Sequence, residues 1–278
     1  MPKGKGASSR AGGGIYSNIF NKRRRKKMKI KGVALGILTL VLVVFASARV
    51  HAFEGSGSAS VDFMSSYVWR GQKLVDNDDV MVQPALSVES AGFGFGFWTN
   101  YDTNYNENTE TDLTLSYTRT YEGFSATVGY IHYDLINSLD TEEIFVSVAF
   151  DTMLSPSVTL FHDFDEGSGQ YLLLSVGHSI DIGGDMALNL GASAGINFDN
   201  KILGTDKKGK EFSDFYNGEL SASLSIPVTD SITIEPKVAY SFPLSDDADD
   251  AIEALNKGYN SGSDTEVFYG GVGVSASF

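Results

Sequence analysis

Hydrophobic and polar residues alternate in twelve segments of the chain after residue 57. One face of each segment carries Val, Leu, Ile, Phe or Tyr, and the other carries Ser, Thr, Gly, Asn or a charged side chain. A period of two predicts β-strands whose two faces meet unlike surroundings. The predicted strands cover residues 58–70, 80–89, 93–97, 113–121, 124–130, 144–150, 158–164, 172–176, 188–198, 220–226, 232–242 and 267–278.

The connections between these strands alternate in length. Short links lie at 91–92, 122–123, 151–156, 181–185 and 227–230. Longer and more polar links lie at 71–79, 102–110, 135–140, 199–212 and 245–264, and 166–169 is a short exception on that side. Short turns on one rim and long loops on the other are typical of membrane barrels. We therefore predict an all-β, transmembrane, antiparallel up-and-down β-barrel of 12 strands.

A secreted β-sandwich or a soluble barrel is the alternative fold, with the apolar faces buried in a core. The polar faces argue against it, because they are rich in Gly and Ser where solvent faces usually carry Lys and Glu. Aromatic residues also gather near strand ends, among them Tyr121, Tyr130 and Phe150. Aromatic girdles of this kind mark the two interfaces of a membrane barrel.

The final predicted strand ends the chain on an aromatic residue, Phe278. Chain ends are usually poorly ordered, so a large apolar side chain there is unexpected in a soluble domain. The segment resembles the closing strand of bacterial outer-membrane barrels, which implies that Phe278 is an assembly signal read by the barrel-assembly machinery. We expect this strand to pair with the first one and close the sheet.

The N-terminal residues 1–52 have a different composition from the rest of the chain. They hold twelve Lys or Arg and no acidic residue, and a cationic run precedes an apolar stretch at 33–46. Small residues follow, with Val50 and Ala52 placed as in a cleavage site. This pattern predicts an extension and cleaved secretory signal peptide over 1–52, with Met28 as a second possible start, and a barrel over 53–278. A permanent transmembrane helix is the alternative, but the stretch is short for one.

The composition of residues 53–278 narrows the functional classes. This part holds nine basic and 35 acidic side chains, so we expect no nucleic-acid partner. The whole chain lacks cysteine, which excludes disulfides and thiolate metal sites. We expect no cofactor and no metal. We also expect no catalytic residue, because His132, His162 and His178 fall on outward faces. The chain is therefore predicted not to be an enzyme. An outer-membrane enzyme is the third alternative, with His132 beside Asn137 or Ser138 as its candidate residues.

Charged residues on the inward faces are the candidate pore lining. They are Asp62, Arg70, Glu89, Asp163, Glu219, Glu235 and Lys237, and Glu143 is a further inward carboxylate. Carboxylates outnumber cations, so a water-filled lumen would favour cations. The alternative is a charge network that fills a closed lumen. Arg70 has two interpretations as well: it lines the pore mouth, or it pairs with a carboxylate of a loop or of the barrel wall.

The segment Ser66-Tyr67-Val68-Trp69-Arg70-Gly71 resembles the TorF-type porin family, a Gram-negative outer-membrane family. Residues 83–86 (QPAL) and 97–101 (FWTNY) sit where the second and third strands of that family would lie. The resemblance covers residues 58–101. It implies an outer-membrane barrel with a role in passive transport.

Two further features concern the loops. Residues 249–257 are the only helix-like stretch, which either lies over the barrel mouth or folds inward as a constriction. Acidic runs at 76–79 and 246–250 are solvated loop carboxylates or, alternatively, bind divalent ions that bridge to lipopolysaccharide. We therefore expect outer-membrane lipid and lipopolysaccharide as surroundings. The predicted function is a porin-like outer-membrane channel for small hydrophilic solutes, with cations preferred. The alternative is a non-conducting barrel with a structural, adhesion or scaffolding role.

Overall fold

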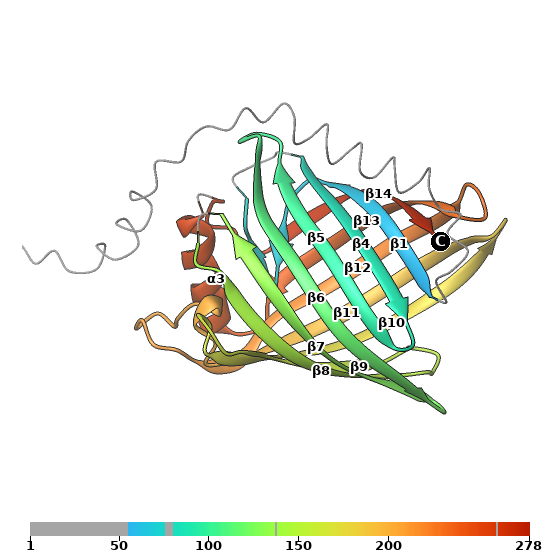
Figure 1. The fold of residues 1–278 in the computed structure, drawn as a ribbon. Coiled ribbons are helices and arrows are strands. Elements are labelled where there is room, and N and C mark those ends of the chain that lie inside the picture. The colour runs from blue at the N-terminus through green and yellow to red at the C-terminus, as the bar shows by residue number, and fades with distance from the viewer. Residues whose placement is uncertain (1–54, 76–79, 137, 260) are drawn as a thin grey trace, which may run out of the picture. The chain divides into compact units, whose positions relative to one another are not determined.

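A computed structural model describes residues 55–75, 80–136, 138–259 and 261–278 (Figure 1). These residues all belong to one compact unit. The predicted extension and signal peptide at 1–52 lie outside the described residues, as does the acidic run at 76–79.

Twelve antiparallel strands form a closed barrel, which confirms the predicted fold (Figure 1). Around the barrel the order is β1-β14-β13-β12-β11-β10-β9-β8-β7-β6-β5-β4, and β4 returns to β1. The wall strands are β1 (Ser56–Met64), β4 (Met81–Ser90), β5 (Phe93–Asp102), β6 (Glu107–Tyr121), β7 (Phe124–Leu135), β8 (Thr141–Phe150), β9 (Ser157–Asp163), β10 (Gly169–Gly183), β11 (Met186–Phe198), β12 (Ser213–Pro227), β13 (Ile232–Pro243) and β14 (Val267–Ser277). Closure leaves no sheet edge with unpaired backbone groups.

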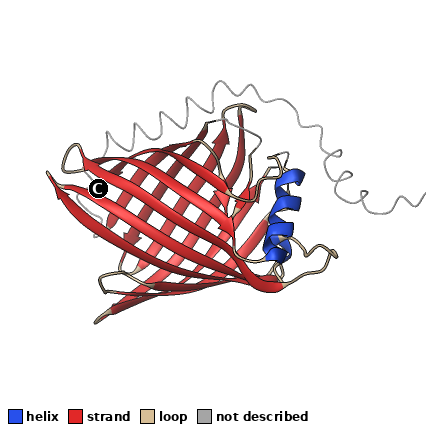
Figure 2. Cartoon of the chain, turned by 180° about the vertical axis from the view of Figure 1, so that it is seen from behind, coloured by secondary structure: helices blue, strands red, loops and turns tan. Residues whose placement is uncertain are grey.

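The last strand pairs with the first, as the sequence predicts. Val61 lies opposite Val274, and Asp62 lies opposite Gly273. The start of β1 and the end of β14 share the rim that carries the short turns. The opposite rim carries the long loops and a helix, α3 (Asp246–Gly258), seen in blue in Figure 2.

The two-residue turn between β4 and β5 shows how the sequence sets a short link. Ala91 and Gly92 both have positive φ, 51° and 85°. Positive φ at both central residues defines the type I′ turn, whose twist matches that of the flanking strands. A Cβ on Gly92 would lie 2.6 Å from the carbonyl oxygen of Thr118, so glycine is required there for space as well.

Large apolar side chains cover the outside of the barrel. Leu115, Val128, Val146, Leu220 and Phe268 each expose more than half of their surface. A monomeric soluble protein rarely exposes so many large apolar groups together. In a membrane barrel these residues form the band that meets lipid.

The inner surface carries hydroxyl and amide groups that bond across neighbouring strands. Ser58 lies 2.9 Å from Ser87, and Ser147 lies 2.8 Å from Thr159, oxygen to oxygen. The side-chain nitrogen of Asn189 donates to Ser225 at 3.0 Å. Such cross-strand pairs stabilise the sheet and give the lumen a polar wall.

The first predicted strand is wrong in its second half. The sequence predicts one strand over 58–70 with Tyr67 and Trp69 facing outward, but β1 ends at Met64. The chain then turns into the barrel and forms a small hairpin of β2 (Val68–Trp69) and β3 (Gln72–Lys73). The physical reason is that both rings find aromatic partners inside: Tyr67 packs on Trp98 and Trp69 packs edge-on to Tyr133.

Helix α3 confirms the predicted helical stretch and extends it by a few residues at its start. The Ser245 hydroxyl accepts a hydrogen bond from the backbone of Ala248, which caps the helix. Asp246, Asp247 and Asp249 in the first turn complement the helix dipole. Within the described ranges, no helix is long and apolar enough to cross a membrane.

Candidate functional site

The connection from β1 to β4 crosses the lumen. The described part of this connection, residues 65–75, follows β1 directly and is here called the inner hairpin. Its tip contacts β8, β9 and β10, which lie on the opposite side of the closed strand order. The inner hairpin therefore spans the barrel interior.

An ion pair fixes the tip of the inner hairpin to the far wall. Both terminal nitrogens of Arg70 donate to the two carboxylate oxygens of Glu143 in β8, each at 2.7 Å. The exposed fractions of these side chains are 7% and 1%. The hydroxyl of Tyr133 donates to the same carboxylate at 2.9 Å. A bidentate pair of this kind is strong and fixes direction as well as distance.

Three aromatic rings surround the Arg70 guanidinium. Its central carbon lies 4.4 Å from the ring centre of Trp69, 4.7 Å from that of Phe161 and 4.3 Å from that of Tyr171. These distances are within the range of cation–π attraction. Burial alone would lower the pKa of Arg70, but Glu143 beside it holds that pKa above its ordinary value. Arg70 is thus a permanent cation within the lumen.

The turn of the inner hairpin is also tightly packed. Arg70 and Gly71 have φ of 48° and 83°, which again gives a turn with both central residues in the left-handed region. A Cβ on Gly71 would lie 2.9 Å from Cβ of Asn217 in β12 and 3.2 Å from Cδ1 of Ile252 in α3. Gly71 is therefore required for the turn and for the close approach.

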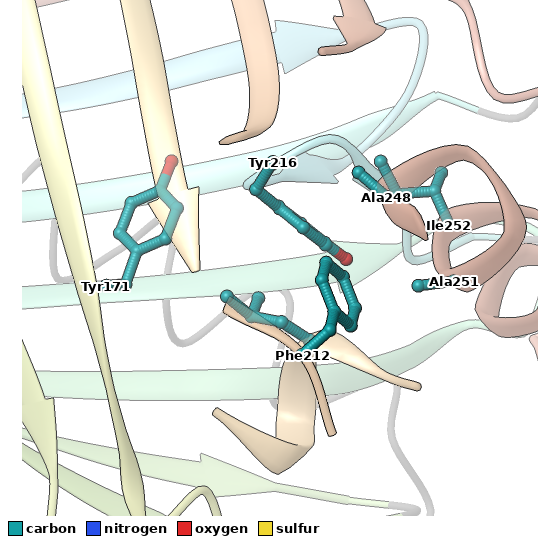
Figure 3. Packing of buried hydrophobic residues seen from close by; sticks show 7 residues of the cluster. Tyr171, Phe212, Tyr216, Ala248, Ala251 and Ile252 are labelled. Carbon is teal, nitrogen blue, oxygen red and sulfur yellow. The ribbon is translucent and has the colours of Figure 1, made fainter. Parts of the chain in front are cut away.

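Two other loop segments pack with the inner hairpin at the loop-side rim. Helix α3 and the 3₁₀ helix η2 (Lys201–Leu203) bury apolar residues against rings from the barrel wall (Figure 3). This cluster consists of Tyr171, Leu203, Phe212, Tyr216, Ala248, Ala251 and Ile252, with Trp69 packed against it. The backbone nitrogen of Lys73 donates to Asn256 of α3 at 2.9 Å. We call the inner hairpin, residues 199–212 and α3 together the plug.

A chamber lined by charged, polar and apolar side chains lies next to the plug. Its volume is about 490 Å³. Its lining shares four residues with an apolar cluster formed around the inner hairpin. Met64 and Tyr67 belong to that cluster, and Trp98 and Tyr269 pack against it. The plug therefore forms one wall of the chamber.

Four of the seven predicted pore-lining residues meet in this chamber: Asp62, Glu219, Glu235 and Lys237. The ammonium of Lys237 lies 3.0 Å from a carboxylate oxygen of Asp62 and 3.4 Å from one of Glu235. Glu219 accepts a hydrogen bond of 2.7 Å from the hydroxyl of Tyr269. Gly273 lies beside Asp62 and Lys237, where any side chain would fill the space that the pair occupies.

The other three predicted residues lie apart from the chamber. Arg70 forms the pair with Glu143, as one of its two interpretations expects. Asp163 is 1% exposed and accepts hydrogen bonds from Thr141 and from two backbone nitrogens of the β9–β10 loop. Glu89 is exposed and sits opposite Gly94, close to the short-turn rim. A pore-lining role for the seven residues stays a prediction.

Sequence reasoning missed two carboxylates near the plug. Glu110 and Asp112 lie on the inward face of β6, and Glu110 is 5% exposed. Burial, and then the neighbouring Glu110 carboxylate, raises the pKa of the Tyr67 hydroxyl. The sequence pattern does not show that these two carboxylates face inward. Residues 107–112 are polar on both faces, so hydrophobic and polar residues do not alternate there. The predicted strand accordingly began only at Leu113.

The chain end is part of the barrel closure. The backbone of Phe278 exchanges two hydrogen bonds with Gly57, at 2.8 and 2.9 Å. The Phe278 side chain is 48% exposed. These contacts extend the β1–β14 ladder to the last residue, and the assembly role of Phe278 stays a prediction.

Comparisons with known proteins identify the fold and not a family. No family model matches the sequence, and no curated protein matches it. Membership of the TorF-type family therefore stays a prediction.

Solved structures share the fold at low sequence identity. The NanC porin is 12% identical to this chain with a TM-score of 0.51, and the match covers 79% of this chain and 98% of the NanC chain. The KdgM porin is 14% identical with a TM-score of 0.50, covering 80% and 99%. With its closed strand order and apolar outer band, the chain has the fold of an outer-membrane porin and is an outer-membrane barrel.

Proposed function

We propose that this protein is a porin-like channel for passive diffusion of small hydrophilic solutes, with a preference for cations. The observation that carries the proposal is the chamber with four charged side chains inside a barrel wall whose outside is apolar. Its charged lining consists of three carboxylates and one ammonium group. A narrow water-filled path lined with net negative charge raises the local concentration of cations.

The plug narrows the loop-side entrance in this proposal. The inner hairpin crosses the lumen and is held by the Arg70–Glu143 pair. Solutes that pass must be small enough to move beside the plug, or the plug must undock first. We therefore expect a small unit conductance for a barrel of 12 strands.

The test is conductance of the refolded barrel in a planar lipid bilayer with a KCl gradient across it. The proposal predicts discrete current steps and a reversal potential displaced toward that of K⁺. Heat-modifiable migration on a gel shows independently that the inserted protein is folded. Folded protein that gives no current above the lipid background would refute the channel.

The plug also favours a second candidate, a non-conducting barrel with a structural, adhesion or scaffolding role. In that case the buried ion pair and the apolar cluster serve only to fill the lumen. The two candidates differ in one variant, Arg70→Ala, which removes the pair with Glu143. Release of the inner hairpin raises the current if a path lies beneath it, and a permanently filled lumen stays silent.

The remaining proposals concern surroundings and assembly. The apolar outer band would contact outer-membrane lipid, and the acidic start of α3 at 246–250 would face lipopolysaccharide at the loop-side rim. The closing strand with Phe278 would be read by the barrel-assembly machinery. The two proteins that share this fold are named porins, which favours transport over enzymatic activity. Among described residues, no group of three His, Cys, Asp or Glu side chains is placed to hold a metal ion.

A further inference from the structure

We infer that the chamber beside the plug binds small organic ammonium ions through its carboxylates and aromatic rings. This inference names the solute class and rests on the proposed channel function. The chamber volume of about 490 Å³ lies in the range of pockets that enclose small molecules. It is large enough for an alkylammonium ion with a few further atoms.

The charge of the chamber is the first argument. Lys237 is its only cationic side chain, and this ammonium is shared between Asp62 and Glu235. Glu219 has a hydrogen bond from Tyr269 but, within the described ranges, no Lys, Arg or His within ion-pair distance. Negative charge therefore remains uncompensated in the chamber, and a bound cation would balance it.

The aromatic wall is the second argument. Trp98 and Tyr67 pack together with ring centres 5.2 Å apart, and both line the chamber, as does Tyr269. The face of a Trp or Tyr ring attracts a cation, most strongly when the cation has shed water. Rings combined with carboxylates are suited to an ammonium group that carries alkyl substituents.

The spread of the carboxylates is the third argument, and it disfavours a metal ion. Asp62, Glu219 and Glu235 come from three different strands, β1, β12 and β13. They form no cluster that converges on one point, as the oxygen ligands of a divalent ion must. A bulky cation with diffuse charge needs no such convergence.

Uncharged polar groups complete the lining. Gln83, Asn189 and Ser223 border the chamber and offer hydrogen bonds to a hydroxyl of the bound ion. A hydroxylated ammonium ion such as choline is therefore a suitable probe.

The test is titration calorimetry with choline of the barrel refolded in micelles of a nonionic polyoxyethylene detergent, which carries no ammonium group. The matched control ligand is 3,3-dimethylbutan-1-ol, which has the shape of choline with carbon in place of the charged nitrogen. We expect choline to bind about tenfold more tightly than this alcohol, because only choline gains the charge and cation–π attraction. Equal affinity of the two ligands would overturn the inference without any variant.

Variants locate the site. Glu219→Gln keeps the shape and removes the unpaired charge, so we expect choline affinity to fall about tenfold. Trp98→Leu removes the ring and is expected to weaken choline more than the alcohol. Glu122→Gln, in the exposed β6–β7 turn, is the matched control and is expected to bind choline as the wild type does. Unchanged affinity in both chamber variants would overturn the site.

Failure of the inference and failure of the channel are distinguishable. Potassium current without choline binding would overturn the inference and leave the channel intact. Choline binding without potassium current would support the site and overturn the channel. Binding of glucose in preference to choline would overturn the inference in favour of a neutral sugar site.

Discussion

Arg70 and Glu143 meet through two hydrogen bonds of 2.7 Å across the barrel interior, although 73 positions separate them in the sequence. The pair joins the tip of a hairpin that leaves one wall to a strand of the opposite wall. Both side chains are almost fully buried. Removing one partner would leave the other charge buried and unpaired, which is more costly than losing the pair as a whole.

A double-mutant cycle measures this relationship. Arg70→Ala is expected to lower the free energy of unfolding by about 3–5 kcal/mol, the usual cost of breaking a buried pair. The double variant Arg70→Ala with Glu143→Gln is expected to lose less than the sum of the single variants, because no unpaired charge remains. Urea unfolding in lipid vesicles provides the measurement. Strictly additive effects would mean that the pair does not hold the inner hairpin.

Gly71 and Gly123 form a natural comparison for the packing of that hairpin. Both have φ of 83°, but a Cβ would meet Asn217 and Ile252 at Gly71 and nothing within 4 Å at Gly123. Gly123→Ala is expected to cost about 1–2 kcal/mol for the left-handed backbone. Gly71→Ala is expected to lower the free energy of unfolding by about 1–3 kcal/mol more than Gly123→Ala does, because the added methyl group overpacks the contact with Asn217 and Ile252. Equal losses in urea unfolding would show that the hairpin tip is not packed against β12 and α3.

The sequence alone predicts the wall and the helix of the plug, but not the inner hairpin. Alternation identifies all twelve wall strands because each has one face toward lipid and one toward a polar lumen. Tyr67 and Trp69 continue the same alternation, so a period of two cannot show that their rings pack inside the barrel on Trp98 and Tyr133 and not against lipid. The one local signal is Arg70-Gly71, where glycine permits the positive φ of a tight turn.

Alternation also predicts part of the candidate site, because it assigns side chains to the inner face of the wall. Asp62, Glu219, Glu235 and Lys237 follow from their inward register, and register is fixed by the apolar faces. Their meeting in one chamber depends on the pairing of β14 with β1, which the sequence predicts, and on the inner hairpin that forms one wall of the chamber, which it does not. The partner of Arg70 is likewise a long-range contact that spacing does not encode.

Charge substitutions in the chamber are expected to shift ion selectivity in opposite directions. Lys237→Gln removes the only chamber cation and is expected to strengthen the preference for K⁺ over Cl⁻. Glu219→Gln removes a carboxylate and is expected to weaken the preference for K⁺ over Cl⁻. Reversal potentials in a KCl gradient measure both, with Glu122→Gln as a control of unchanged selectivity. Shifts of the same sign in both variants would place these side chains outside the ion path.

The closing strand is expected to govern assembly more than transport. Phe278→Asp places a charge beside the Gly57 contact that ends the β1–β14 ladder. We expect less folded barrel in the outer membrane, measured by heat-modifiable migration, and an unchanged conductance per folded molecule. Wild-type amounts of folded barrel would show that the final ring is not an assembly signal.

The proposed ion path, which the inner hairpin restricts, is tested most directly by single-channel recording. Wild-type protein, Arg70→Lys and Arg70→Ala are compared in the same bilayer and salt. Lysine keeps the charge without the bidentate geometry, so its conductance is expected to lie between the other two. We expect small cation-selective current steps for the wild type and larger steps for Arg70→Ala. Identical steps in the wild type and both variants would show that the inner hairpin does not restrict an ion path. Folded protein that gives no current in any of the three would show that there is no ion path.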